Sequence, residues 1–358
     1  MKATKNMKIL IIKLNKIGDV LLTSPLFANL KAHFKDCQID LLANAGTEGL
    51  VDSTLLRHIY CVQRPKNFFR RLQKALALLI ALKKEKYDIV IGLTNGERTA
   101  FTAFITRAKV RVGFQPHSFW TKHIYTHKIH YKAQHNIESN LDALRLIGVP
   151  ILSKRVCANI AKGCTKLQNL PPKFVHCHFF SDWLFKCLDD SFCAKIVDFI
   201  SETYKIPCVL TAAPTQNELQ KIEHIKTLIT QNAIIFAGNL RLDEVALLNS
   251  KALAFVGVDT SIMHLSAANR IPTFAFFGPS FTHAWGPWDN DLMESTYTSQ
   301  KGIQRMGKHF VYQESLSCVP CGRDGCNGSK KSDCLLSKLN ENLALQNLQE
   351  FLTPLLKS

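Results

Sequence analysis

Phe255-Val-Gly-Val-Asp-Thr-Ser-Ile-Met-His264, followed shortly by Ile271-Pro-Thr-Phe-Ala-Phe-Phe-Gly-Pro279, is the stretch that decides the fold. Each segment contains an apolar run of the length that buried strands have. Between the two runs, Asp259, Thr260 and Ser261 supply helix-capping side chains, and an apolar-periodic segment follows them. Strand, cap, helix, strand is the order in which a doubly wound sheet presents a helix N-terminus to a phosphate.

The same alternation runs through both halves of the 358-residue chain. In the first half, we predict strands at residues 8–14, 38–43, 87–93 and 110–114, with helices at 20–34, 68–84 and 135–147. In the second half, we predict strands at 174–178, 208–212, 233–236, 253–256 and 273–277, with helices at 191–204, 217–230, 242–250 and 262–268. Strands that alternate with helices of this length indicate parallel sheets, and the chain length suits two α/β domains.

The predicted domain boundaries follow from a change in composition. Residues 150–172 carry Lys, Asn, Gly and the pair Pro171-Pro172, which is typical of a connector. We therefore predict a first domain at residues 1–165 and a second at 166–335. A final amphipathic helix is predicted within residues 336–358.

Positive charge is concentrated in the first half of the chain. The net charge is +17, with 24 Lys or Arg against 10 Asp or Glu in residues 1–150 and 21 against 18 in the remainder. Such a charge attracts phosphorylated acceptors, anionic lipid surfaces or nucleic acid, although it also serves ordinary solubility. The basic, amphipathic residues 68–84 suit a membrane surface, but base rates favour an ordinary helix that covers the sheet.

The first predicted strand begins close to the N-terminus and ends in a loop that could carry catalysis. Its apolar core is too short for a signal peptide, and no apolar run is long enough to span a bilayer, so we expect a cytoplasmic protein. Gly18 and Asp19 follow this strand, where ligands of open parallel sheets bind. Asp19 is either a helix N-cap or a general base that accepts a proton from an attacking hydroxyl.

Candidate ligand-binding residues follow the strands of the second half. Lys186 offers a positive charge for a phosphate, although exposed lysines are common. Glu218 either accepts ribose hydroxyls or complements a helix dipole. The backbone N–H groups that begin a helix near Thr260 suit a diphosphate, and His264 lies one turn further along that helix.

Four cysteines gather near the C-terminus, in contrast to the eight others that are scattered along the chain. Cys318, Cys321, Cys326 and Cys334 have the composition of a structural zinc site. Their spacing does not match the common zinc patterns, so a loop of reduced thiols is the alternative interpretation. A disulfide is disfavoured in a cytoplasmic protein.

These motifs resemble those of glycosyltransferase family 9, the ADP-heptose:lipopolysaccharide heptosyltransferases. Residues 8–25 are similar to the family's N-terminal signature, and residues 257–264 with Phe277-Gly-Pro279 are similar to its donor-site signature. Trp183-Leu-Phe-Lys-Cys187 and the cysteine-rich residues 318–334 resemble the heptosyltransferase III branch. One departure is Asp182, where relatives of that branch tend to carry a basic residue.

The resemblance implies a GT-B fold, in which two Rossmann-like lobes face a central cleft and a C-terminal helix returns to the N-terminal lobe. It implies an inverting transfer of heptose from ADP-heptose to the lipopolysaccharide inner core, on the cytoplasmic face of the inner membrane, with no cofactor required for the chemistry. Asp19 then matches the proposed base, beside Gly18 on the acceptor side. The donor-site positions are matched by Lys186, Glu218, Asp259, Thr260, Ser261 and His264.

Three other functions compete with this interpretation. A related family 9 enzyme would use another nucleotide sugar. A nicotinamide-dependent oxidoreductase would have similar lobes, but no G-x-G-x-x-G follows any predicted strand. A basic, non-enzymatic protein for anionic surfaces or nucleic acid would explain the charge, yet the chain has no helix-turn-helix or aromatic-rich basic motif, so we expect no nucleic-acid partner.

Overall fold

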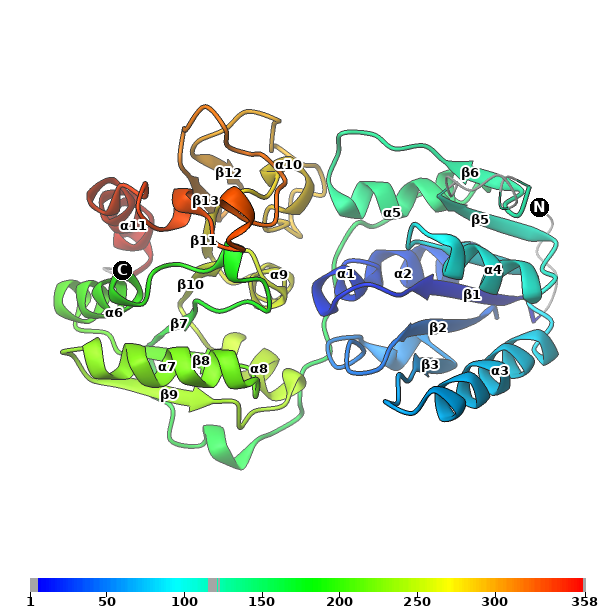
Figure 1. Ribbon diagram of the computed structural model, residues 1–358, viewed down its shortest axis with the longest axis horizontal. Coiled ribbons are helices and arrows are strands. Elements are labelled where there is room, and N and C mark those ends of the chain that lie inside the picture. The colour runs from blue at the N-terminus through cyan, green and yellow to red at the C-terminus, as the bar shows by residue number, and fades with distance from the viewer. Residues whose placement is uncertain (1–5, 115–120, 122, 357–358) are drawn as a thin grey trace. The chain divides into compact units, whose positions relative to one another are not determined.

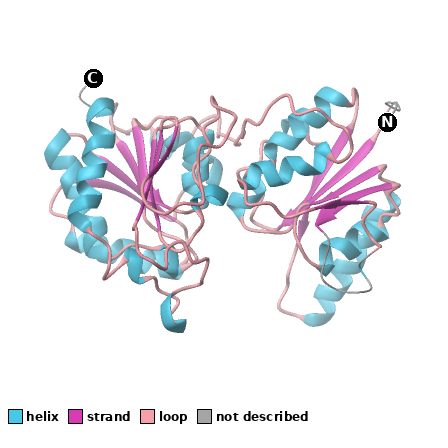
Figure 2. Ribbon diagram, turned by 90° about the horizontal axis from the view of Figure 1, so that it is seen from above, coloured by secondary structure: helices cyan, strands magenta, loops and turns pink. Residues whose placement is uncertain are grey.

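Two α/β units make up the protein, and the predicted fold class is confirmed. The computed structural model describes residues 6–114, 121 and 123–356. The units are Met1–Asn159 and Ile160–Ser358, so the boundary falls six residues before the predicted one. In each unit, helices cover both faces of a central sheet (Figure 1, Figure 2).

The first unit is built on a parallel sheet with the strand order β3-β2-β1-β4-β5-β6. Its strands are β1 (Lys8–Lys13), β2 (Gln38–Asn44), β3 (His58–Val62), β4 (Ile89–Gly92), β5 (Val110–Phe114) and β6 (His127–Ile129). Residues 9–12 of β1 are fully buried because helices cover both faces of this central strand. Two short outer strands, β3 and β6, escaped the sequence analysis.

The helices of the first unit are α1 (Ile17–Leu21), α2 (Ser24–His33), α3 (Phe68–Lys84), α4 (Glu97–Ile105) and α5 (Asn136–Arg145). Helix α2 packs against α5, and α3 packs against α4. The single helix predicted at residues 20–34 is in fact two. It breaks before Ser24 because Pro25, which lacks an N–H group, is accommodated in the first turn of a new helix.

The second unit contains a seven-stranded sheet in the order β12-β13-β11-β10-β7-β8-β9. Its strands are β7 (Val175–His178), β8 (Cys208–Ala212), β9 (Ala233–Ala237), β10 (Ala254–Val258), β11 (Thr273–Phe277), β12 (Gln304–Met306) and β13 (His309–Gln313). Only the edge strand β12 is antiparallel to its neighbour. Without β12, the strand order repeats that of the first unit, which is the doubly wound order of dinucleotide-binding folds.

The helices of the second unit are α6 (Asp190–Tyr204), α7 (Gln216–Leu228), α8 (Leu242–Asn249), α9 (Ser261–Ala268), α10 (Thr282–Trp285) and α11 (Glu341–Leu356). Helix α11 packs on α6 and β13 of the second unit. Its return to the first lobe, which the resemblance implies, stays a prediction. Its apolar face supplies Leu348, Phe351 and Leu352 to the core of that unit. The Phe351 ring lies 5.6 Å from that of Phe274, so the helix covers apolar surface that would otherwise face water.

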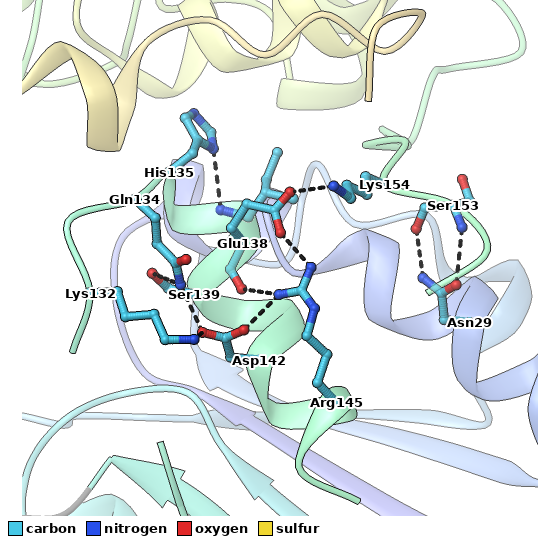
Figure 3. Close-up of polar contacts among 11 residues, drawn as sticks. Asn29, Lys132, Gln134, His135, Glu138, Ser139, Asp142, Arg145, Ser153 and Lys154 are labelled. Carbon is cyan, nitrogen blue, oxygen red and sulfur yellow. Dashed lines mark hydrogen bonds and ion pairs between the residues drawn. The ribbon is translucent and has the colours of Figure 1, made fainter. Parts of the chain in front are cut away.

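The connector between the units is held to the first one, which explains the early boundary. Asn29 of α2 accepts the Leu152 and Ser153 N–H groups at 2.7 and 3.1 Å and donates to the Ser153 carbonyl at 2.6 Å. Lys154 forms an ion pair of 2.7 Å with Glu138 of α5, and this contact belongs to a wider polar cluster on that helix (Figure 3). The connector composition therefore marked a loop correctly but did not show where the second unit begins.

The structure contains no helix, among the residues that it describes, with the length and apolarity needed to cross a bilayer.

Candidate functional site

One candidate site lies where β1 leaves the sheet of the first unit. Strands β1 and β4 are neighbours there, and the chain runs to opposite sides of the sheet from this point, which is where open parallel sheets bind ligands. Gly18 is buried in α1, and Asp19 lies in its first turn. The N-cap position is occupied by Lys16, so the capping role considered for Asp19 is wrong.

A buried lysine accompanies Asp19. The Lys13 Nζ lies 3.7 Å from the Asp19 Oδ1, and Lys13 is only 3% exposed. The same amine donates to the Leu93 carbonyl at 3.3 Å and to the Asn140 Oδ1 at 3.4 Å. Burial lowers the pKa of Lys13, and the Asp19 carboxylate opposes this effect. The amine and the carboxylate therefore stabilise each other's charge in a site with little water.

Sequence reasoning missed both Lys13 and Asn140. The Asn140 side chain, on α5, also donates to the Leu22 carbonyl at 3.1 Å, so it joins α5 to the segment between α1 and α2. One signal was available: Lys13 ends a strand whose preceding four residues are all apolar, and a lysine at such a position must be paired if it is buried. No local signal marked Asn140.

Another candidate site lies at the corresponding point of the second unit. Lys186 ends a short 3₁₀ turn after β7, and Asp259 follows β10, the neighbour of β7 in the sheet. Their side chains form an ion pair, with the Lys186 Nζ 2.6 Å from the Asp259 Oδ2. Burial alone would raise the pKa of Asp259, but the charges of Lys186 and His264, together with hydrogen bonds from Lys186 and Ser280, lower that pKa.

The remaining residues of the donor-site signature surround this ion pair. Thr260 is the N-cap of α9 and accepts the Met263 N–H at 3.4 Å, while Ser261 is the first residue of the helix. His264 is buried, and its ring centroid lies 6.3 Å from that of Trp285 on α10. The structure therefore brings Lys186, Asp259, the start of α9 and His264 together within one unit.

Gly257 allows β7 and β10, the two strands that lead to this site, to pack closely. It pairs with His178 across β10 and β7, and a Cβ atom at this position would overlap the His178 carbonyl oxygen. The glycine that opens the signature is thus required for strand packing directly before Asp259.

Comparison with known proteins agrees with this geometry. The model of glycosyltransferase family 9 (heptosyltransferase) matches residues 75–312, more than half of the chain. The chain belongs to glycosyltransferase family 9. It is therefore a glycosyltransferase, and the family predicted from the motifs is confirmed.

Individual relatives of this family 9 enzyme are distant. Lipopolysaccharide heptosyltransferase 3 of Escherichia coli K12 is 26% identical over 292 residues, which cover 77% of this chain and 84% of the relative. A family 9 glycosyltransferase structure from Veillonella parvula has a TM-score of 0.76 at 17% identity and covers 99% of both chains. The structure of E. coli ADP-heptose lipopolysaccharide heptosyltransferase II has a TM-score of 0.73 at 16% identity, with 97% of this chain and 99% of that one covered. The GT-B fold predicted from the sequence is thereby confirmed.

Glu218 of the family 9 enzyme has a local structural partner. Its Oε2 accepts the Ala213 N–H at 2.6 Å, and Thr215, not Glu218, is the N-cap of α7. Burial is the main reason why the pKa of Glu218 is raised, and the charge of Asp182 raises it further. Glu218 thus closes the loop between β8 and α7, and its ribose-binding role stays a prediction.

The four C-terminal cysteines do not support the predicted zinc site. Among the described residues, which include all four, no group of three or more His, Cys, Asp or Glu side chains is placed to hold a metal ion. Cys318 and Cys321 are exposed, whereas Cys334 is buried in the core of the second unit. Burial, together with the neighbouring Cys326 and Cys321, raises the pKa of the Cys334 thiol to about 12.

We expect a double-mutant cycle to reveal the coupling between Lys13 and Asp19. Asp19→Asn leaves a buried amine without its carboxylate and should lower the free energy of unfolding by about 1–3 kcal/mol. Lys13→Met combined with Asp19→Asn should recover part of this loss, because the uncompensated charge is gone. Urea denaturation of the four proteins gives the coupling energy, and strictly additive single effects would contradict it.

The pKa of Asp259 predicts a pH dependence for Lys186→Ala. In the wild type the folded-state pKa lies below the unfolded value, so the stabilisation is complete at neutral pH and is lost only as the pH falls through the folded pKa. Without Lys186, burial should raise that pKa above the unfolded value, and the variant should then lose stability as the pH rises. The difference in unfolding free energy between the two proteins should shrink from pH 7 to pH 4. Lys186→Arg is the control, and a difference that does not vary with pH would contradict the pairing.

Proposed function

We propose that this family 9 enzyme transfers a heptose from ADP-heptose to the inner core of lipopolysaccharide by a single inverting displacement. The observation that carries the proposal is the placement of Lys186 and Asp259 beside the N-terminus of α9 at the switch point of the second sheet. The names of two relatives support the substrates, since one is a lipopolysaccharide heptosyltransferase and the other an ADP-heptose lipopolysaccharide heptosyltransferase.

On the donor side, the second unit offers charge and N–H donors to a diphosphate. The N–H groups that begin α9 have no partners inside the helix and carry the positive end of its dipole. Lys186 adds a cation, and its pairing with Asp259 fixes the position of the amine before the donor arrives. His264 and Glu218 are proposed to contact the donor next to these groups.

The reaction then needs one base. Asp19 accepts the proton of the acceptor hydroxyl while that oxygen forms a bond to the anomeric carbon, and the bond from this carbon to the ADP oxygen breaks on the opposite face. The negative charge that develops on ADP is stabilised by Lys186 and the start of α9. The Lys13 amine, 3.7 Å from the Asp19 Oδ1, places a positive charge beside this carboxylate.

The acceptor side is proposed to be the first unit, at an anionic membrane surface. Residues 1–150 carry 24 Lys or Arg and only 10 Asp or Glu, and this excess suits a phosphorylated, lipid-borne acceptor on the cytoplasmic face of the inner membrane.

Substitution of the base should separate chemistry from binding. We expect Asp19→Asn to lower kcat by about 10²–10⁴-fold, the usual contribution of a general base, and to leave the affinity for ADP-heptose nearly unchanged. Turnover with purified core acceptor and calorimetric titration of the donor measure the two quantities. Near-wild-type turnover in Asp19→Asn would exclude this residue as the base.

The lipopolysaccharide of cells that lack the protein identifies the substrate. Mass spectrometry of the core should show the loss of one heptose, and plasmid-borne wild-type protein, but not Asp19→Asn, should restore it. Loss of a different sugar would assign another nucleotide sugar to this family 9 enzyme, and an unchanged core would contradict the proposal.

A further inference from the structure

The helix α3 leaves its apolar side chains largely uncovered. Every residue from 66 to 77 is exposed, and Leu82 is the one buried residue of the helix. Phe68 and Phe69 are 60% and 79% exposed, and Leu72, Leu76 and Ile80 continue the apolar stripe at intervals of four residues. An ordinary surface helix buries such a stripe against its sheet, so the first three turns of α3 do not serve that purpose.

A cavity lies beside this helix. It has a volume of about 620 Å³ and extends between α3, the end of β3 and α4. Leu42, Val62, Leu78 and Phe101 give it apolar walls. Leu14, the first residue after β1, also lines it, so the cavity reaches the edge of the sheet from which α1 and Asp19 begin.

Cations surround the apolar surface. Residues 64–84 contain seven Lys or Arg and no Asp or Glu. Four cations line the cavity, namely Arg64, Arg71, Lys74 and Arg98. In the part of the chain that the structure describes, none of the four forms an ion pair. Apolar side chains interspersed with unpaired cations are the composition of helices that lie in the interface of an anionic bilayer.

We propose that α3, together with Phe101 and Phe104 of α4, is a docking surface for an anionic phospholipid bilayer. Its exposed apolar side chains enter the boundary between head groups and acyl chains, and the cations that surround the cavity contact lipid phosphates. The charge argues against a symmetric dimer through this surface, because such a dimer would set seven cations against seven. The inference rests on the proposed function in one respect: the purpose of the docking surface is to bring a lipid-borne acceptor to the Asp19 side of the first unit.

Sedimentation of the full-length protein with vesicles tests the proposal. The vesicles are phosphatidylcholine alone or phosphatidylcholine with phosphatidylglycerol, at low and high salt. The wild type should bind the anionic vesicles at low salt, with weaker binding at high salt and little to neutral vesicles. Phe68→Ser with Phe69→Ser should weaken binding at least about ten-fold, because each ring loses burial in the interface.

The cations are tested by Arg71→Gln with Lys74→Gln, which should weaken binding to anionic vesicles by roughly five-fold for each charge removed. The matched controls lie in the second unit. Leu292→Ser with Leu343→Ser removes two exposed apolar side chains, and Lys162→Gln with Lys251→Gln removes two exposed cations. Both controls should bind as the wild type does. The fluorescence of Phe69→Trp should be quenched by brominated lipid, which reports insertion without reference to any loss of binding.

Several outcomes would overturn the proposal: no binding by the wild type, equal losses in the test and control variants, or no quenching in Phe69→Trp. If the wild type self-associates and the double variant Phe68→Ser with Phe69→Ser does not, the surface belongs to a second copy of this chain instead. Thermal melting checks the fold of each variant, and calorimetric titration with ADP tests the donor half separately. Failure of vesicle binding with intact ADP binding would therefore remove the docking surface and leave the proposed transfer reaction standing.

Discussion

The rest of the structure depends on one constraint, the topological switch point of each doubly wound sheet. In both units the first strand lies beside the fourth, and the connections from these two strands run to opposite faces of the sheet. The loops that leave their carboxyl ends must then separate, and backbone N–H groups and side chains are left there without sheet partners. Lys13 and Asp19 use this position in the first unit, and Lys186 and Asp259 use it in the second.

The candidate site of each unit contains a lysine and an aspartate, but the buried member of the pair differs between the two units. In the first, the lysine is buried and the carboxylate is the more exposed partner, with side-chain exposures of 4% and 16%. In the second, the carboxylate is buried and the lysine is more exposed, at 4% and 21%. The more accessible group of each pair is the one proposed to meet the substrate, because the buried partner fixes its position and its charge.

Much of this was available from the sequence, since buried parallel strands are continuous apolar runs and helices have their own period. Residues 110–114, 208–212 and 273–277 were predicted with the bounds that the structure has. The strands β3, β6, β12 and β13 were missed because they are only partly apolar or too brief to show a period. The signature near Asp259 showed which residues gather after β10, whereas Asn140 was invisible because its contact with Lys13 joins residues 127 positions apart. The amphipathic pattern of residues 339–356 showed that this helix has an apolar face, but not that Leu348, Phe351 and Leu352 belong to the core of the second unit.

The clamped connector has a mechanical consequence for the enzyme. The Asn159 N–H is bonded to the Leu50 carbonyl of the first unit at 2.9 Å, and the Ala161 N–H is bonded to the Asp243 carbonyl of the second at 3.0 Å. Ile160 alone lies between these two anchored peptides. While both hydrogen bonds are kept, the free tether between the two units is a single residue long. A tether of this length lets the two units separate far less than a long flexible linker would.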